Sequence, residues 1–240
     1  MKSQYIFFLI LLISCQKPKP APQITSVKSK AKVEEITAKE NSLRTDTIIL
    51  DKNAEITHII IHLTEQKPDK DSIIESKFRL DFYKNKNKIV SKKITITGYE
   101  KGSEWSGSYG FPDSSQNNAS FIKIDFGYPA CGYTFENYLY YLKKNDLELV
   151  HQWQSMSDSG WGNWTEFLSL ESKNDLDIFY CKSVSFEPAD DDSEDFGIVT
   201  YSDSISFILT GNSWKKKLLS PKDKPYFEKK MSINEFYKQD

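Results

Sequence analysis

From residue 45 onward, apolar and polar residues alternate in short runs rich in Ile, Val, Phe, Tyr and Thr. In the segment 77–84, Phe78, Leu80 and Phe82 alternate with charged residues, which predicts a strand with one core face and one solvent face. Strands are expected at 45–51, 56–64, 77–84, 89–97, 119–127, 135–143, 146–154, 164–170, 175–186, 196–202, 204–210 and 213–219. About 12 short strands separated by polar turns predict a single antiparallel all-β domain over residues 45–240.

Turn residues refine this prediction. Hairpin turns are expected at Asn85–Asn87, at Asn145–Asp146 and, most clearly, at Gly211–Asn212. A short C-terminal helix is expected to begin at Ser232, because Glu235 completes a capping box three residues later. A β-sandwich or an up-and-down barrel is the leading architecture. A β-propeller is the alternative, although the sequence has no internal repeat of about 40–50 residues, the length of one blade.

The N-terminus has a different pattern. One lysine, Lys2, precedes an apolar run at 5–13, and Ser14 and Cys15 follow this run. Because spanning a bilayer needs roughly 20 apolar residues, this run is too short for a membrane helix and predicts an export signal over residues 1–14. The alternative is an anchor helix that is not cleaved.

The segment Leu12-Ile13-Ser14-Cys15 resembles the lipobox of bacterial lipoproteins. The resemblance implies that the Cys15 thiol is lipidated, that residues 1–14 are removed and that acyl chains anchor the protein to a membrane. Gln16, where an aspartate would favour the inner membrane, points to the outer membrane of the cell envelope. A Lys-, Ile- and Asn-rich composition with only two arginines is similar to lipoproteins of the Bacteroidetes. The domain that follows resembles no family.

Residues 15–44 form a Lys- and Pro-rich segment with few large apolar side chains, which predicts a flexible tether. It carries seven basic and three acidic residues. A basic tether can lean on anionic head groups, or it can act as a plain spacer. The whole chain has a net charge of −2, so after removal of Lys2 and of this tether (+4), residues 45–240 carry about −7. That balance argues against a nucleic-acid partner.

Two cysteines remain beyond Cys15. In an oxidising compartment, Cys131 and Cys181 are expected to form a disulfide, with two buried free thiols as the alternative. A catalytic cysteine is the weakest interpretation, because no Cys–His motif accompanies either residue.

The sequence predicts neither a metal site nor a cofactor. His58 and His62 are four residues apart on an expected strand, which separates them by about 13 Å, too far to share one zinc ion. Six carboxylates crowd the segment 187–195, but they lack the spacing of a calcium loop. A solvated acidic loop explains them better.

Two aromatic segments are candidates for ligand binding. The expected loop 98–118 contains Trp105, Tyr109 and Phe111, and a second Gly-rich segment contains Trp161. Exposed aromatic faces can stack on sugars or grip peptides. The alternative is that these rings cover the ends of the β-sheet core.

No catalytic constellation is evident. The nucleophile-elbow, phosphate-loop and dinucleotide fingerprints are absent, and Glu136 and Glu166 are a pair that any chain with 34 acidic residues could offer. The leading hypothesis is a non-enzymatic envelope lipoprotein that binds a glycan or an envelope protein through aromatic loops. The alternatives are an envelope hydrolase acting on glycans or peptides, and a structural component of the envelope.

Overall fold

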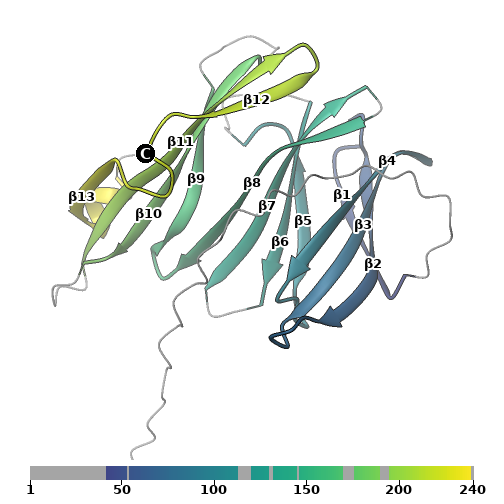
Figure 1. Ribbon diagram of the computed structural model, residues 1–240, viewed down its shortest axis with the longest axis horizontal. Coiled ribbons are helices and arrows are strands. Elements are labelled where there is room, and N and C mark those ends of the chain that lie inside the picture. Colours follow the sequence, from purple (N-terminus) through teal and green to yellow (C-terminus); the bar gives the residue numbers. More distant parts are fainter. Residues whose placement is uncertain are drawn as a thin grey trace, which may run out of the picture. The chain divides into compact units, whose positions relative to one another are not determined.

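The structure is a computed structural model that describes residues 42–52, 54–112, 120–129, 132–144, 146–169, 176–189 and 195–238. Within these ranges, 13 strands form two antiparallel sheets, and one short helix follows them (Figure 1). The predicted signal and residues 15–41 of the predicted tether lie outside the described residues. Among the described residues, no helical segment has both the length and the hydropathy needed to span a membrane.

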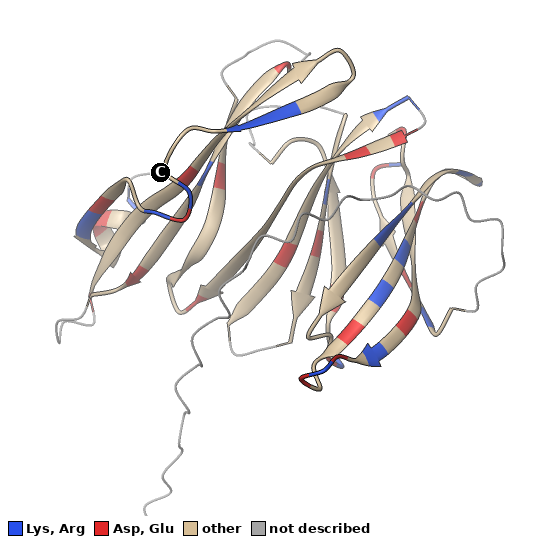
Figure 2. Cartoon of the chain, viewed as in Figure 1, with Lys and Arg blue, Asp and Glu red and all other residues tan. Residues whose placement is uncertain are grey.

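The first sheet is a four-stranded meander in which each strand pairs with the next one in sequence. Its strands are β1 (Arg44–Ile49), β2 (His58–Pro68), β3 (Ile74–Lys84) and β4 (Asn87–Thr97). Charged residues of both signs are interspersed along β2–β4, as Figure 2 shows.

The second sheet has nine strands, and β5 to β12 also follow one another in sequence order. Strand β11 is long enough to pair with β13 along its first half and with β12 along its second half. The strands are β5 (Glu104–Tyr109), β6 (Phe121–Tyr128), β7 (Tyr133–Lys143), β8 (Asp146–Asp158), β9 (Trp161–Ser169), β10 (Ile178–Pro188), β11 (Phe196–Thr210), β12 (Ser213–Leu218) and β13 (Phe227–Ser232).

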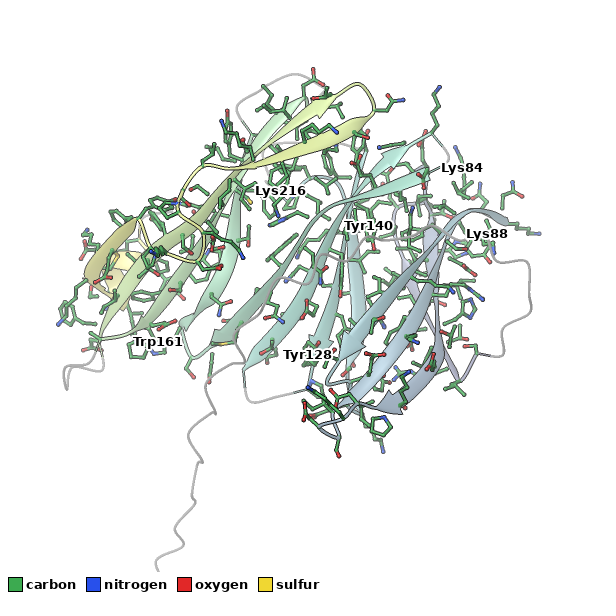
Figure 3. The ribbon with its side chains drawn as sticks, in the orientation of Figure 1. Lys84, Lys88, Tyr128, Tyr140, Trp161 and Lys216 are labelled. Atoms are coloured by element: carbon green, nitrogen blue, oxygen red, sulfur yellow. The ribbon has the colours of Figure 1, made fainter. Side chains whose placement is uncertain are left out.

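The main core lies between the four-stranded sheet and the β6–β7 part of the larger sheet. Alternate residues of β2, such as Ile59 and Ile61, cluster there with alternate residues of β6, such as Ile124 and Phe126. Tyr140 of β7 belongs to the same cluster (Figure 3). Burying a large apolar side chain contributes roughly 1.5–3 kcal/mol, so this layer accounts for the pairing of the two sheets.

Two smaller cores lie elsewhere along the larger sheet. One contains Phe121, Phe179 and Phe207, and the other contains Phe186 and Met231 with Phe236 of the helix packed against it. The residue Phe121 points away from the main core because it alternates with Ile122 along β6. The larger sheet therefore packs side chains on both of its faces.

The predicted all-β fold and its C-terminal helix are confirmed. Helix α1 spans Ile233–Phe236, and the Ser232 hydroxyl accepts a hydrogen bond from the backbone N–H of Glu235, as the capping box predicts. Two sheets packed face to face correspond to the sandwich alternative. The barrel alternative is wrong, because neither sheet closes on itself within the described residues, and the strands do not group into four-stranded propeller blades.

Hairpin predictions can be compared with the observed register. Lys84 pairs with Asn87, and Thr210 pairs with Ser213, so the two-residue turns at 85–86 and 211–212 lie where the sequence places them. Asn145 lies outside the described residues. Two corrections concern strands: the expected loop 98–118 contains β5, and the two strands expected at 196–202 and 204–210 are one strand, β11.

Candidate functional site

The larger sheet opens between β8 and β9. These strands form only three residue pairs, at their hairpin, and the last of them joins Met156 to Asn163. Beyond this pair, β8 continues against β7 and β9 continues against β10, so that β8 and β9 diverge (Figure 1). Gly162 is needed inside this hairpin, because a Cβ there would lie 2.0 Å from the Met156 carbonyl oxygen. Several hollows lie along this divergence, and two of them share Asn163 and Trp164 as lining residues.

The first hollow, the aromatic cleft, has a volume of about 620 Å³. Rings from β7, β9 and the C-terminal segment line it, and Tyr133 (73% exposed) and Tyr237 (53% exposed) face solvent at its edge. Its rings include Tyr133, Phe135, Trp161, Trp164, Phe236 and Tyr237. A hollow of this volume that is lined mainly by aromatic rings is typical of small-molecule binding sites.

Helix α1 holds the two tryptophans of the aromatic cleft in place. Phe236 stacks on Phe186 at 4.3 Å between ring centroids, Phe186 lies 4.8 Å from Trp161, and Phe236 lies 5.7 Å from Trp164. The Tyr237 hydroxyl donates a hydrogen bond to the Gly160 carbonyl oxygen at 2.9 Å. Trp161 thus lies at the hairpin end of β9, where the Phe186 ring packs against it and holds its position (Figure 3).

The charges beside the aromatic cleft are paired. The Glu166 carboxylate is 2.9 Å from the Lys182 ammonium group, and that ammonium group lies 3.6 Å from the centre of the Tyr201 ring. Glu166 and Tyr201 both line the cleft. A cation held between a carboxylate and an aromatic face is stabilised by both partners.

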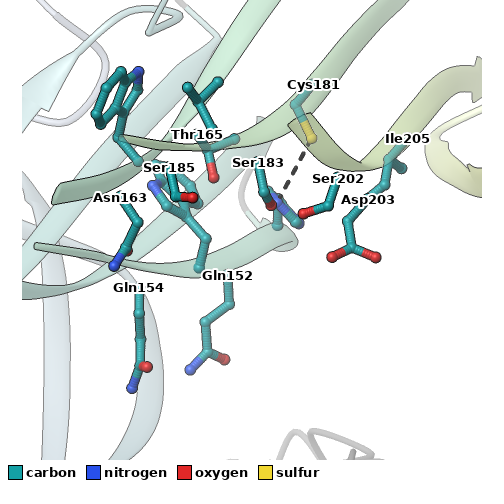
Figure 4. A pocket seen from close by; sticks show the side chains of 14 residues that line it. Gln152, Gln154, Asn163, Thr165, Cys181, Ser183, Ser185, Ser202, Asp203 and Ile205 are labelled. Carbon is teal, nitrogen blue, oxygen red and sulfur yellow. Dashed lines mark hydrogen bonds between the residues drawn. The ribbon is translucent and has the colours of Figure 1, made fainter. Parts of the chain in front are cut away.

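The second hollow, the polar groove, has a volume of about 360 Å³ and is lined by amides and hydroxyls (Figure 4). Cross-strand register explains the row of hydroxyls, because Thr165 of β9 pairs with Ser183 of β10, and Ser183 pairs with Ser202 of β11. Period-two alternation places these polar residues on the face opposite Trp164 and Val184. The uncharged polar side chains of the groove are Gln152, Gln154, Asn163, Thr165, Ser183, Ser185 and Ser202.

A Cys–His contact lies at one end of the polar groove. The Cys181 thiol is 3.7 Å from Nε2 of His151, and the Lys216 ammonium group is 3.5 Å from Nδ1 of the same ring (Figures 3 and 4). Burial raises the pKa of Cys181 to about 12. Burial, reinforced by the charge of Lys216, lowers the pKa of His151 to about 3. Both groups are therefore neutral at neutral pH.

This contact does not form a nucleophilic pair. An ammonium group only donates hydrogen bonds, so the Nδ1 atom of His151 accepts from Lys216 and the ring proton sits on Nε2, pointing to the thiol. A general base would need Nε2 free to take the thiol proton. No sequence motif indicates this contact, because 30 residues separate its two members.

The expected disulfide is not present in the structure, where Cys181 is a buried free thiol. Cys131, the other cysteine of the predicted disulfide, lies outside the described residues.

The aromatic residues expected in the loop 98–118 pack against the cores. The Trp105 ring lies 4.8 Å from Phe126, Tyr109 packs against the main core, and Phe111 is only 6% exposed and lies 4.8 Å from Phe179. For these three residues the alternative of rings that cover the core holds. Of the four candidates, Trp161 lines a hollow, the aromatic cleft.

The remaining candidates are separate from one another. Glu166 lines the aromatic cleft, whereas the Glu136 carboxylate accepts a hydrogen bond from the Gln154 amide at 2.5 Å. His58 stacks on the Tyr83 ring, and Nε2 of His62 is 3.4 Å from the Asp81 carboxylate. Among the described residues, no three His, Cys, Asp or Glu side chains are grouped to hold a metal ion. Residues 190–194 of the acidic segment, and Cys15, lie outside the described residues.

Trp164 closes the Gly-rich segment 153–164 in which the sequence singled out only Trp161, and the polar groove was not predicted. The signal for the groove was present in the alternation of Ser183 and Ser185 with Val184 and Phe186 along β10. Comparisons with protein families, with curated proteins and with solved structures found no match to this chain.

Proposed function

We propose that this chain is a lipoprotein of the bacterial cell envelope, anchored through Cys15, and that its all-β domain is a non-enzymatic binding module. The lipobox-like segment 12–15 supports the anchor, and Gln16 supports the outer membrane as its location. The basic tether would hold the domain away from the membrane surface. The ligand would be a glycan or another envelope protein.

The observation that carries this proposal is the aromatic cleft. Trp161 and Trp164 are fixed by packing against Phe186 and Phe236, while Tyr133 and Tyr237 are largely exposed. Fixed rings beside a hollow lose little conformational freedom on binding, so their contact area converts efficiently into affinity. An aromatic surface of this kind is typical of ligand sites and rare on a surface that binds nothing.

The Cys181–His151 contact does not favour the alternative of an envelope hydrolase, because both groups are held neutral and the ring proton points at the sulfur. Glu136 is not among the residues that line the aromatic cleft with Glu166, which does not favour a glycosidase pair either. The proposal is therefore a binding function.

Substituting Trp161→Ala tests the proposal. The full chain would be applied to immobilised oligosaccharides and to detergent-extracted envelope proteins, and its bound partners would be titrated. We expect Trp161→Ala to weaken the best-bound partner at least tenfold, since hot-spot tryptophans cost 2 kcal/mol or more, about 30-fold. The control is Tyr83→Ala, which removes a ring from the four-stranded sheet and should leave the affinity unchanged. If Trp161→Ala binds like the unmodified chain, the aromatic cleft is not the site.

A further inference from the structure

We propose that the ligand of this module is an uncharged oligosaccharide, and that the polar groove is a second subsite for it beside the aromatic cleft. The inference rests on the proposed binding function of the cleft and names its ligand class. It is carried by the hydrogen-bonding groups of the groove, by the partners that the lining carboxylates already have and by the two residues that the hollows share.

The two hollows meet where β8 and β9 separate. Asn163 is the last residue of β9 that pairs with β8, and both it and Trp164 line the aromatic cleft as well as the polar groove. Trp164 and Asn163 are neighbours in a strand, so their side chains point to opposite faces. A chain-like ligand stacked on Trp161 and Trp164 would therefore reach the groove hydroxyls on the other face by passing Asn163 through the opening between β8 and β9.

The groove offers hydrogen bonds that the protein itself does not use. Within the described part of the chain, the side chains of Asn163, Thr165, Ser183 and Ser202 form no hydrogen bond. A hydroxyl donates one bond and accepts two, and an amide both donates and accepts. Sugar hydroxyls have the same dual character, so a row of such side chains suits a saccharide better than a ligand that only donates or only accepts.

The carboxylates that line the two hollows already have hydrogen-bond or ionic partners, which favours an uncharged ligand. Asp203, the carboxylate that lines the groove, accepts a hydrogen bond from the backbone N–H of Asp223 at 2.9 Å. Glu166 is paired with Lys182 at 2.9 Å. A cationic ligand group would have to compete with these partners, and an anionic group placed beside Asp203 or Glu166 would be repelled.

Stacking alone would not select saccharides, because the aromatic cleft could also hold an apolar peptide. The groove makes the difference. An apolar peptide side chain placed there would bury unpaired hydroxyls, at a cost that exceeds the gain from contact. The combination of fixed rings on one side and free hydroxyls on the other therefore points to a ligand with apolar faces and polar edges, which describes a neutral pyranose chain.

The test uses the full chain on an array of hexasaccharides. Neutral members would be built from glucose, mannose, xylose and N-acetylglucosamine, and charged members from galacturonate and sulfated glucosamine. The test variant, Thr165→Val/Ser183→Ala, removes two groove hydroxyls with little change of shape. Its matched control, Thr47→Val/Ser108→Ala, removes two exposed hydroxyls from β1 and β5. Thermal unfolding of both variants checks that they fold.

We expect the array to retain the chain on neutral members, and the groove variant to weaken that binding about tenfold while the control leaves it unchanged. The saccharide assignment is overturned if the retained members are charged, if the groove variant binds with unchanged affinity, or if no member is retained. Trp161→Ala separates the two proposals. If a peptide or protein is bound in a Trp161-dependent way and no hexasaccharide is retained, the binding function stands and the ligand class is wrong. If Trp161→Ala leaves the affinity for the bound hexasaccharide unchanged, the proposed binding function of the aromatic cleft is wrong.

Discussion

His151 is a histidine that the fold keeps neutral. It is 8% exposed and packs between aromatic rings, with Trp153 stacked at 5.4 Å and Phe207 edge-on at 5.4 Å. Lys216 points its charge at the same ring. Burial disfavours the charged ring and the Lys216 charge repels it, so the pKa of His151 falls to about 3 from an ordinary 6.5.

A dependence of stability on pH follows. Above pH 6.5, His151 is neutral in the folded and the unfolded chain, and its contribution to stability is fully present. As the pH falls below 6.5, the unfolded chain binds a proton that the folded chain does not, so the free energy of unfolding decreases down to about pH 3. Between pH 7.5 and pH 5.0, we expect this group to account for a loss of roughly 2 kcal/mol.

Urea unfolding of the unmodified chain and of His151→Leu at both pH values measures this loss. His151→Leu keeps an apolar filling and removes the titrating group, so its stability should fall by about 2 kcal/mol less on acidification. His58→Gln, on the outer face of the four-stranded sheet, is the control and should follow the unmodified chain. Equal losses in His151→Leu and the unmodified chain would show that His151 is protonated in the folded state.

At the scale of single elements, Gly197 sets how closely β11 approaches Trp161. A Cβ at this position would lie 2.3 Å from the Trp161 ring and 2.6 Å from the Phe186 ring. We expect Gly197→Ala to push Trp161 out of place. The overpacking should lower the free energy of unfolding by about 1–3 kcal/mol, and the displaced ring should lower the affinity for the ligand of the aromatic cleft severalfold. Thermal unfolding and titration on the hexasaccharide array measure the two effects. Unchanged affinity together with reduced stability would show that the position of Trp161 does not matter for binding.

Strands that bury much surface could be predicted from the sequence, and strands that bury little could not. Central strands such as β3 and β10 alternate large apolar residues with polar ones, and they lie near their expected positions. β5 and β13 were missed: β5 contains Ser106-Gly107-Ser108, and β13 is mostly charged and exposed. The polar residues 202–204 suggested a break in β11, where Asp203 adopts a φ of 47° and the strand continues past it. Pairing with neighbouring strands overrides a weak local pattern at such places.

At the scale of the whole molecule, the site could be predicted only in part. Trp161 was a candidate from the sequence, but the aromatic cleft also needs Tyr133 from β7 and Tyr237 from the C-terminal end, more than 100 residues apart. Which ring covers the core and which lines a hollow depends on where β8 and β9 stop pairing. No residue type in the sequence indicates that point. For the same reason, Trp105 and Phe111 resembled site residues in the sequence and belong to core packing in the structure.

The proposed anchor also belongs to the scale of the whole molecule, because it would set where the proposed binding module works. The lipobox-like segment predicts that Cys15→Ala blocks acylation and removal of residues 1–14, leaving a heavier precursor that carries no lipid. Each buried methylene of an acyl chain contributes about 0.8 kcal/mol of membrane affinity, so a variant without acyl chains should be extracted from membranes far more readily. Metabolic labelling with a radioactive fatty acid, followed by fractionation, reads out both effects.

Cys131→Ala is the matched control for this experiment, since it removes a thiol and leaves the lipobox intact. It should keep the label, the shorter mass and the membrane fraction of the unmodified chain. A labelled Cys15→Ala protein would contradict the assignment of Cys15, and the module would then need another route to the envelope. An unlabelled Cys15→Ala protein whose domain still binds its ligand would separate the two parts of the molecule: the N-terminal segment determines location, and the cleft between β8, β9 and α1 determines recognition.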